Sequence, residues 1–173
     1  MFNEQSIKDK IRFKANQMNI SFNTLMKMYV FECILKRLSN STYKNKIVLK
    51  GGALLCSLYG LDNRVTQDMD LSIIKYELKK ETINSIFQDI LKKDLNDGIH
   101  FTLINSEPIN TQIEYEGYRL KIEYRFNKMR DIIYIDIATG DYITPKPVIY
   151  NYPQILENKI ETEKIQNNEK KEK

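Results

Sequence analysis

The sequence predicts an α/β (α+β) fold: a mixed β-sheet with helices packed on it, preceded by two N-terminal helices. Apolar residues recur at helical spacing in residues 1–40, a helical pattern over residues 81–91 separates strand-like runs, and alternating apolar and polar residues follow from residue 100. The order of elements is therefore two helices, then strands separated by a helix, then a meander of strands. This order is expected for a sheet covered by helices. At 173 residues, 42% of them hydrophobic, the chain can bury one globular core.

The first elements are helices over residues 5–18 and 21–38. Lys36 and Arg37 near the end of the second helix suit the negative end of its dipole. The second helix carries an apolar stripe at spacings of three or four, formed by Leu25, Met28, Phe31, Leu35 and Leu38.

The next segments alternate between strand and helix. Residues 47–49 are a short strand-like run that stops at Gly51 and Gly52, and residues 53–59 predict a short helix closed by Gly60. Further along, the patterns predict a strand over residues 70–74, a helix over 81–91, a turn at 96–98, and strands over 100–104, 117–126 and 131–138.

These patterns divide the chain into one domain and a tail. The domain spans residues 1–155, with the N-terminal helices in 1–40 and the sheet-containing core in 44–155. Residues 156–173 are charged and almost without apolar side chains, so they bury too little surface to offset the entropy of ordering. We expect this tail to be disordered.

Composition bounds the compartment and the partners. No apolar run approaches the length of a membrane span, and the N-terminus lacks the apolar region of a secretory signal, so we expect no membrane partner. Cys33 and Cys56 stand apart, as buried thiols do in a reducing compartment, which predicts a cytoplasmic location. The net charge of +4 permits an anionic ligand such as a nucleotide or RNA without requiring one.

Two carboxylates stand on one face of the strand near residue 70. Asp68 and Asp70 are two positions apart, so their side chains point the same way while Met69 and Leu71 point into the core. Neighbouring carboxylates repel each other unless a cation lies between them, and Mg²⁺ prefers hard oxygen ligands. The alternative is an aspartate pair on a solvated strand face, which is the commoner fate of this spacing.

A third carboxylate interrupts the apolar strand over residues 131–138. Asp136 lies between isoleucines, where an unpaired carboxylate is costly to bury. If this strand neighbours the Asp70 strand, the three carboxylates converge. The alternative is a strand-end residue that accepts hydrogen bonds from nearby amides.

The glycine pair supplies a complementary phosphate site. Gly51 and Gly52 lack Cβ atoms and allow close backbone approach, while the helix that follows directs N–H groups at an anion. Lys50 adds a positive charge beside them. The alternative is a tight turn from strand to helix, which by itself is commoner.

Taken together, these residues resemble the AbiEii-type nucleotidyltransferase toxins of the polymerase-β-like nucleotidyltransferase superfamily. Residues 28–41, 115–119 and 135–145 also resemble blocks of this family, and the resemblance covers residues 5–155. The motif is a glycine pair, then R-x-T-x-D-x-D, then a third carboxylate, matched by Gly51, Gly52, Arg64, Thr66, Asp68, Asp70 and Asp136.

The resemblance implies a nucleotidyltransferase fold and Mg²⁺-dependent transfer of NMP from an NTP to an RNA acceptor, with tRNA expected. Asp68 and Asp70 would hold Mg²⁺ against the phosphates, and Asp136 would help to bind the catalytic metal of a two-metal site. A cognate antitoxin in an abortive-infection or toxin–antitoxin system is the expected protein partner. The nucleotide-binding residues implied are Lys50, Gly51, Gly52, Arg64, Thr66 and Arg119.

Two of these assignments have alternatives. Arg64 is equally well explained by a salt bridge inside the fold. Arg119, Lys121 and Arg125 alternate along one strand and could face RNA or triphosphate, although a solvated strand face explains the last two as well.

The chain also departs from the family. Members continue into a helical region with an A-E-K lysine block, which this sequence does not match. We therefore expect a truncated relative, and a catalytically inactive module that binds nucleotide, RNA or antitoxin is the alternative to the enzyme. A metal-dependent phosphohydrolase using the same three carboxylates is a further alternative.

Overall fold

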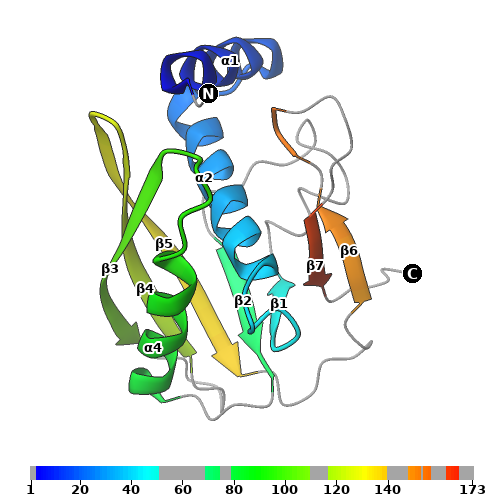
Figure 1. Ribbon diagram of the computed structural model, residues 1–173, viewed down its shortest axis with the longest axis vertical. Coiled ribbons are helices and arrows are strands. Elements are labelled where there is room, and N and C mark those ends of the chain that lie inside the picture. Colours follow the sequence, from blue (N-terminus) through cyan, green and yellow to red (C-terminus); the bar gives the residue numbers. More distant parts are fainter. Residues whose placement is uncertain are drawn as a thin grey trace.

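The computed structural model describes residues 3–50, 69–74, 79–109, 117–139, 148–152, 154–156 and 163–167. All strands among these residues belong to one mixed seven-stranded sheet with the order β3-β4-β5-β2-β1-β7-β6, and α2 and α4 lie against one of its faces (Figure 1). This arrangement confirms the predicted α+β fold with two N-terminal helices. In chain order the elements are α1 (Glu4–Met18), α2 (Phe22–Ser39), β1 (Ile47–Lys50), β2 (Met69–Ile73), α4 (Lys80–Leu91), β3 (Ile99–Pro108), β4 (Gly117–Phe126), β5 (Met129–Thr139), β6 (Val148–Tyr152) and β7 (Glu163–Asn167).

Both N-terminal helices begin at polar caps. The Asn3 side chain accepts a hydrogen bond from the Ser6 amide at 3.1 Å, and Ser21 accepts one from the Thr24 amide at 3.1 Å. Each cap satisfies an amide that has no partner within its helix. Both predicted helices are confirmed to within one residue at each end.

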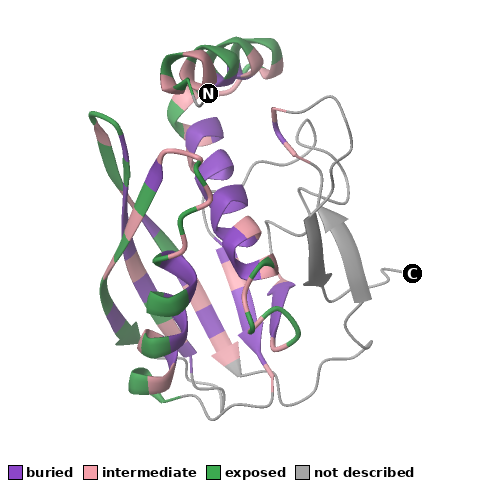
Figure 2. Cartoon of the chain, in the orientation of Figure 1, coloured by how far each residue is buried: buried purple, intermediate pink, exposed green. Residues whose placement is uncertain are grey.

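Helix α2 is the central element of the core. Its buried side chains cover its whole circumference after the first turn, rather than one stripe, because α1, α4 and the sheet all pack around it (Figure 2). A helix that is buried on every side carries apolar residues all round. The predicted stripe is therefore only part of the buried surface of α2.

Arg37 fixes the end of α2 to the turn before β3. Its guanidinium is 1% exposed and donates to both oxygens of Asp97, at 2.7 and 2.8 Å. It also donates to the carbonyls of Cys33, Lys93 and Ile99 at 2.9 to 3.0 Å. The sequence predicted only a dipole partner for this residue; the structure shows a buried charge whose donors are all directed at acceptors, as burial requires.

A second buried charge on α2 holds a segment from the other end of the chain. The Glu32 carboxylate is 2% exposed and accepts a hydrogen bond from the Ile155 amide at 3.1 Å, while Lys14 donates to the Ile155 carbonyl. Both backbone groups of Ile155 are thus satisfied by side chains of the N-terminal helices. Residues 154–156 are attached to the helical layer by these bonds.

The sheet combines antiparallel and parallel pairs. β1 pairs antiparallel with β2, and β5 pairs antiparallel with β4, which in turn pairs antiparallel with β3. Between these groups, β2 and β5 pair in parallel, which requires a crossover. The crossover from β2 to β5 consists of α4, β3 and β4.

The last two strands were not predicted. β6 and β7 pair antiparallel, and β7 pairs in parallel with β1. Residues 163–167 fall within the segment predicted to be disordered, so that prediction does not hold for these five residues. The prediction considered only apolar burial, whereas backbone hydrogen bonds to a neighbouring strand do not depend on side-chain type.

Two further observations concern the helices and the cysteines. Among the described residues, every helix is too short or too polar to cross a bilayer. Cys33 is buried, and burial raises the pKa of its thiol, so the group is unreactive at neutral pH. Cys56 lies outside the described residues.

We expect Asp97→Ala to lower the free energy of unfolding by about 3–5 kcal/mol, because it leaves the buried Arg37 charge without its partner. Asp9→Ala is the control: its pair with Arg12 is exposed, with side-chain exposures of 57% and 55%, and should contribute less than about 1 kcal/mol. Urea denaturation followed by circular dichroism measures both. Similar small losses in the two variants would contradict the assigned role of Arg37.

Candidate functional site

Five charged residues form a row across five neighbouring strands. Register pairing places Lys50 opposite Asp70, Asp70 opposite Asp136, Asp136 opposite Arg119, and Arg119 opposite Glu107. Side chains of register partners project from the same face of a sheet. We call this set the charged row.

The hydrophobic core determines which face carries the charged row. Side chains alternate along a strand, so burial of the neighbours of Asp70 and Asp136 on one face directs the two carboxylates to the other. A slip of one residue in either strand would move its carboxylate into the core. The neighbours, all at most 1% exposed, are Met69, Leu71, Ile135 and Ile137.

Arg119 makes a two-pronged contact with Asp136. Its Nε donates to Oδ1 at 2.8 Å and its Nη2 donates to Oδ2 at 3.0 Å, so both carboxylate oxygens accept from one guanidinium. The side chains are 55% and 25% exposed, respectively. The guanidinium carbon also lies 5.9 Å from the centre of the Tyr134 ring, which is itself partly exposed.

The charged row contains one more acid than bases. Three carboxylates stand against one lysine and one arginine, and two of the carboxylates, Asp70 and Asp136, are direct neighbours. Like charges at this spacing destabilise each other, whereas a cation between them stabilises both. The electrostatics of the site therefore favour an added cation beside these two aspartates.

The residues present fit a hard divalent cation such as Mg²⁺. Carboxylate oxygens are the ligands that this ion prefers. Ser72 lies two positions along β2 on the same face as Asp70, and its buried hydroxyl oxygen has no hydrogen-bond partner among the described residues. In the described part of the chain, however, His, Cys, Asp and Glu side chains form no cluster of three, so Asp70 and Asp136 would supply two ligands and a third would have to come from elsewhere.

The structure brings together four of the residues predicted from the sequence. Asp70, Asp136, Lys50 and Arg119 are consecutive members of the charged row. Glu107 was missed, because its position opposite Arg119 depends on a register shift between Leu103 and Asn105 that the sequence does not show. Asp68, Gly51, Gly52, Arg64 and Thr66 lie outside the described residues.

A separate ion cluster occupies the same face of β4. Glu123 accepts from Arg125 at 3.0 Å and from Arg130 at 2.6 Å, and its side chain is only 8% exposed. The hydrogen bond from Arg130 is the main reason that the pKa of the Glu123 carboxyl lies below its usual value. Arg125, for which the sequence favoured a solvated strand face over a stripe facing RNA or triphosphate, contacts a protein carboxylate and is 56% exposed.

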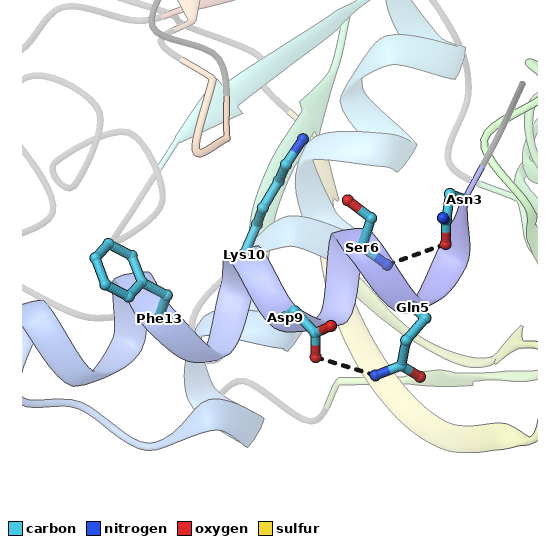
Figure 3. A pocket seen from close by; sticks show the side chains of 6 residues that line it. All are labelled: Asn3, Gln5, Ser6, Asp9, Lys10 and Phe13. Atoms are coloured by element: carbon cyan, nitrogen blue, oxygen red, sulfur yellow. Dashed lines mark hydrogen bonds between the residues drawn. The ribbon is translucent and has the colours of Figure 1, made fainter.

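One hollow among the described residues runs along α1 (Figure 3). Its polar groups serve the helix itself: Ser6 donates to the Asn3 cap, and Gln5 donates to Asp9 at 3.0 Å (Figure 3). It is shallow, about 450 Å³ in volume, and is lined by Asn3, Gln5, Ser6, Asp9, Lys10 and Phe13. These contacts explain its polar side chains without a ligand.

Comparison with known proteins identifies the family. The family described as nucleotidyl transferase AbiEii toxin, type IV TA system, matches residues 33–166, well over half of the chain. The chain belongs to this family. The AbiEii match includes β1, β2, β4 and β5, and therefore every strand that carries a nucleotidyltransferase motif residue predicted from the sequence.

Three solved structures also match this chain, each with a TM-score below 0.5. A proposed nucleotidyltransferase from H. pylori is 21% identical, with a TM-score of 0.48 over 85% of this chain and 55% of that one. JHP933 from Helicobacter pylori is 20% identical, with a TM-score of 0.47 over 84% and 53%. An antigenic nucleotidyltransferase-like protein from Paracoccidioides brasiliensis is 15% identical, with a TM-score of 0.44 over 79% and 59%. This AbiEii-family chain spans just over half the length of these proteins.

A search among curated proteins found no match.

We expect Glu123→Gln to lower stability at pH 7 but not in acid. Because the folded-state pKa of Glu123 is lowered, its carboxylate contributes stability that is present above its ordinary pKa of 4.5 and is lost as the pH falls through the folded-state value. The difference in unfolding free energy between wild type and variant should therefore shrink from pH 7 to about pH 3. Urea denaturation at both pH values measures it; an equal difference at both would show that the ion cluster does not stabilise the sheet.

Proposed function

We propose that this AbiEii-family protein transfers a nucleoside monophosphate from an NTP to an RNA acceptor, with tRNA as the expected acceptor, in a Mg²⁺-dependent reaction. The single observation that carries the proposal is the register pairing of Asp70 with Asp136 on adjacent parallel strands. Two neighbouring carboxylates that are both partly exposed are suited to holding a divalent cation against phosphate oxygens. Family membership supports the reaction class.

The proposed mechanism assigns roles to the residues of the charged row. Asp70 and Asp136 would hold Mg²⁺, together with Asp68 from the adjoining segment, and the ion would neutralise charge on the phosphates. Lys50, next to Asp70, would place its ammonium near the phosphates. Gly51, Gly52, Arg64 and Thr66 are the further nucleotide-binding residues proposed.

The reaction exchanges the phosphoanhydride bond between the α- and β-phosphates for a phosphodiester bond to the acceptor. The acceptor hydroxyl oxygen bonds to the α-phosphorus of the NTP, and the bond from that phosphorus to the bridging oxygen breaks, which releases pyrophosphate. The hydroxyl proton leaves toward the carboxylate of Asp136 or the surrounding water. Asp136 therefore has two tasks in the proposal: it is a metal ligand and it lies where the acceptor loses its proton.

The setting is proposed from the family. AbiEii toxins belong to a type IV toxin–antitoxin system, so a cognate antitoxin is the expected protein partner. A role in abortive infection of phage-infected cells, with a cytoplasmic location, follows from the same membership.

We expect Asp70→Asn to weaken binding of Mg-NTP by at least about tenfold, since loss of even an outer-shell partner of a metal ligand costs roughly 10–100-fold. Isothermal titration calorimetry with non-hydrolysable analogues of the four NTPs measures the affinity. Asp131→Asn is the control, because Asp131 lies on β5 but outside the charged row and is exposed. Unchanged binding in Asp70→Asn would contradict the site.

We expect label at the α-phosphate of an NTP to pass to tRNA, and label at the γ-phosphate to leave with pyrophosphate. Asp136→Asn should reduce the α-label on RNA to background, since it removes one metal ligand. Denaturing gels with each labelled NTP measure transfer. Retained Mg-NTP binding without transfer from any of the four NTPs would contradict the enzyme and identify the protein as the binding module.

A further inference from the structure

Arg119 and a divalent cation compete for the same atoms. The guanidinium already contacts both oxygens of Asp136, at 2.8 and 3.0 Å, and these are the atoms that a metal ion would take. We propose that Arg119 is an exchangeable cation: it neutralises Asp136 in the metal-free protein, a metal-bound NTP displaces it, and its guanidinium then contacts the phosphates. This inference rests on the proposed nucleotidyltransferase function.

The charges present in the metal-free and in the metal-bound protein support this exchange. Without metal, Arg119 lies between Asp136 and Glu107, while Asp70 lies directly beside Asp136 on the other side. A divalent cation supplies two positive charges to Asp70 and Asp136, so the guanidinium is no longer needed there and repels the incoming ion. The triphosphate brings new oxygen acceptors, and a planar guanidinium can donate to two oxygens of one phosphate at once.

The surroundings of Arg119 allow it to move without leaving the sheet face. Its side chain is 55% exposed, so it does not need to break out of the core. Tyr134 presents its ring 5.9 Å from the guanidinium carbon, and Glu107 is its register partner on the opposite side from Asp136. Both offer favourable contacts to a displaced guanidinium.

The other arginine–carboxylate cluster on this face differs in the features that matter. Glu123 contacts two arginines, is only 8% exposed, and has Thr102 and Ile132 as its register partners. Neither register partner is a carboxylate with which Glu123 could share a cation. This cluster is a permanent structural contact and provides a matched control on the same strand.

Titration with Mn²⁺, followed by the electron paramagnetic resonance signal of the free ion, tests the exchange. Arg119→Gln removes the competitor and should bind Mn²⁺ alone several-fold to about tenfold more tightly than wild type, within the usual range of coupling between two ligands. With a non-hydrolysable NTP analogue present, the same variant should bind the analogue more weakly than wild type. Opposite signs in the two titrations distinguish exchange from a merely structural role.

Two further variants complete the test. Arg125→Gln should leave both titrations at wild-type values, because Arg125 contacts Glu123 instead. Arg119→Lys keeps the charge but loses the two-pronged contact, so its Mn²⁺ affinity should lie between those of wild type and Arg119→Gln. If circular dichroism shows that Arg119→Gln is unfolded, Arg119→Lys tests the exchange in its place. It should still bind Mn²⁺ more tightly than wild type.

The outcomes separate this inference from the proposed function. The exchange is overturned if Mn²⁺ binding requires Asp136 but is unchanged or weakened in both Arg119 variants. The proposed nucleotidyltransferase site is still supported by that result. Failure of wild type and of both Arg119 variants to bind Mn²⁺, with and without nucleotide, overturns both.

Discussion

The parallel pairing of β2 with β5 is the constraint on which the site depends. It joins strands that are far apart in the sequence and sets Asp70 directly beside Asp136. The pairing cannot slip, because one residue of shift would bury the carboxylates and expose Met69, Leu71 and their neighbours. The interaction that stabilises the core thus also fixes the place where two negative charges meet.

The helices hold this pairing from the other side of the sheet. Between β2 and β5 the chain passes through α4, β3 and β4, and the buried Arg37 of α2 fastens the turn that leads from α4 into β3. Glu32, also on α2, fastens residues 154–156. Two buried charges on α2 therefore connect the helical layer to the turn before β3 and to residues 154–156. Neither charge belongs to the charged row.

Local patterns in the sequence were sufficient for most of the fold. Helical spacing and strand alternation predicted α1, α2, α4 and the strands up to β5, since these signals are local. Cross-strand register is not local, so the contact between Arg119 and Asp136 and the position of Glu107 could not be predicted. β7 was missed because its residues, EKIQN, leave little apolar signal, and β6 was missed although its residues, VIYNY, are typical of a strand.

X-ray diffraction at the manganese edge, on crystals grown with Mn²⁺ and a non-hydrolysable NTP analogue, tests the central claim most directly. The account predicts an anomalous peak within bonding distance of the Asp70 and Asp136 carboxylates, with the Arg119 guanidinium turned from Asp136 toward the phosphates. An anomalous peak remote from both aspartates, with the contact between Arg119 and Asp136 intact, would contradict it.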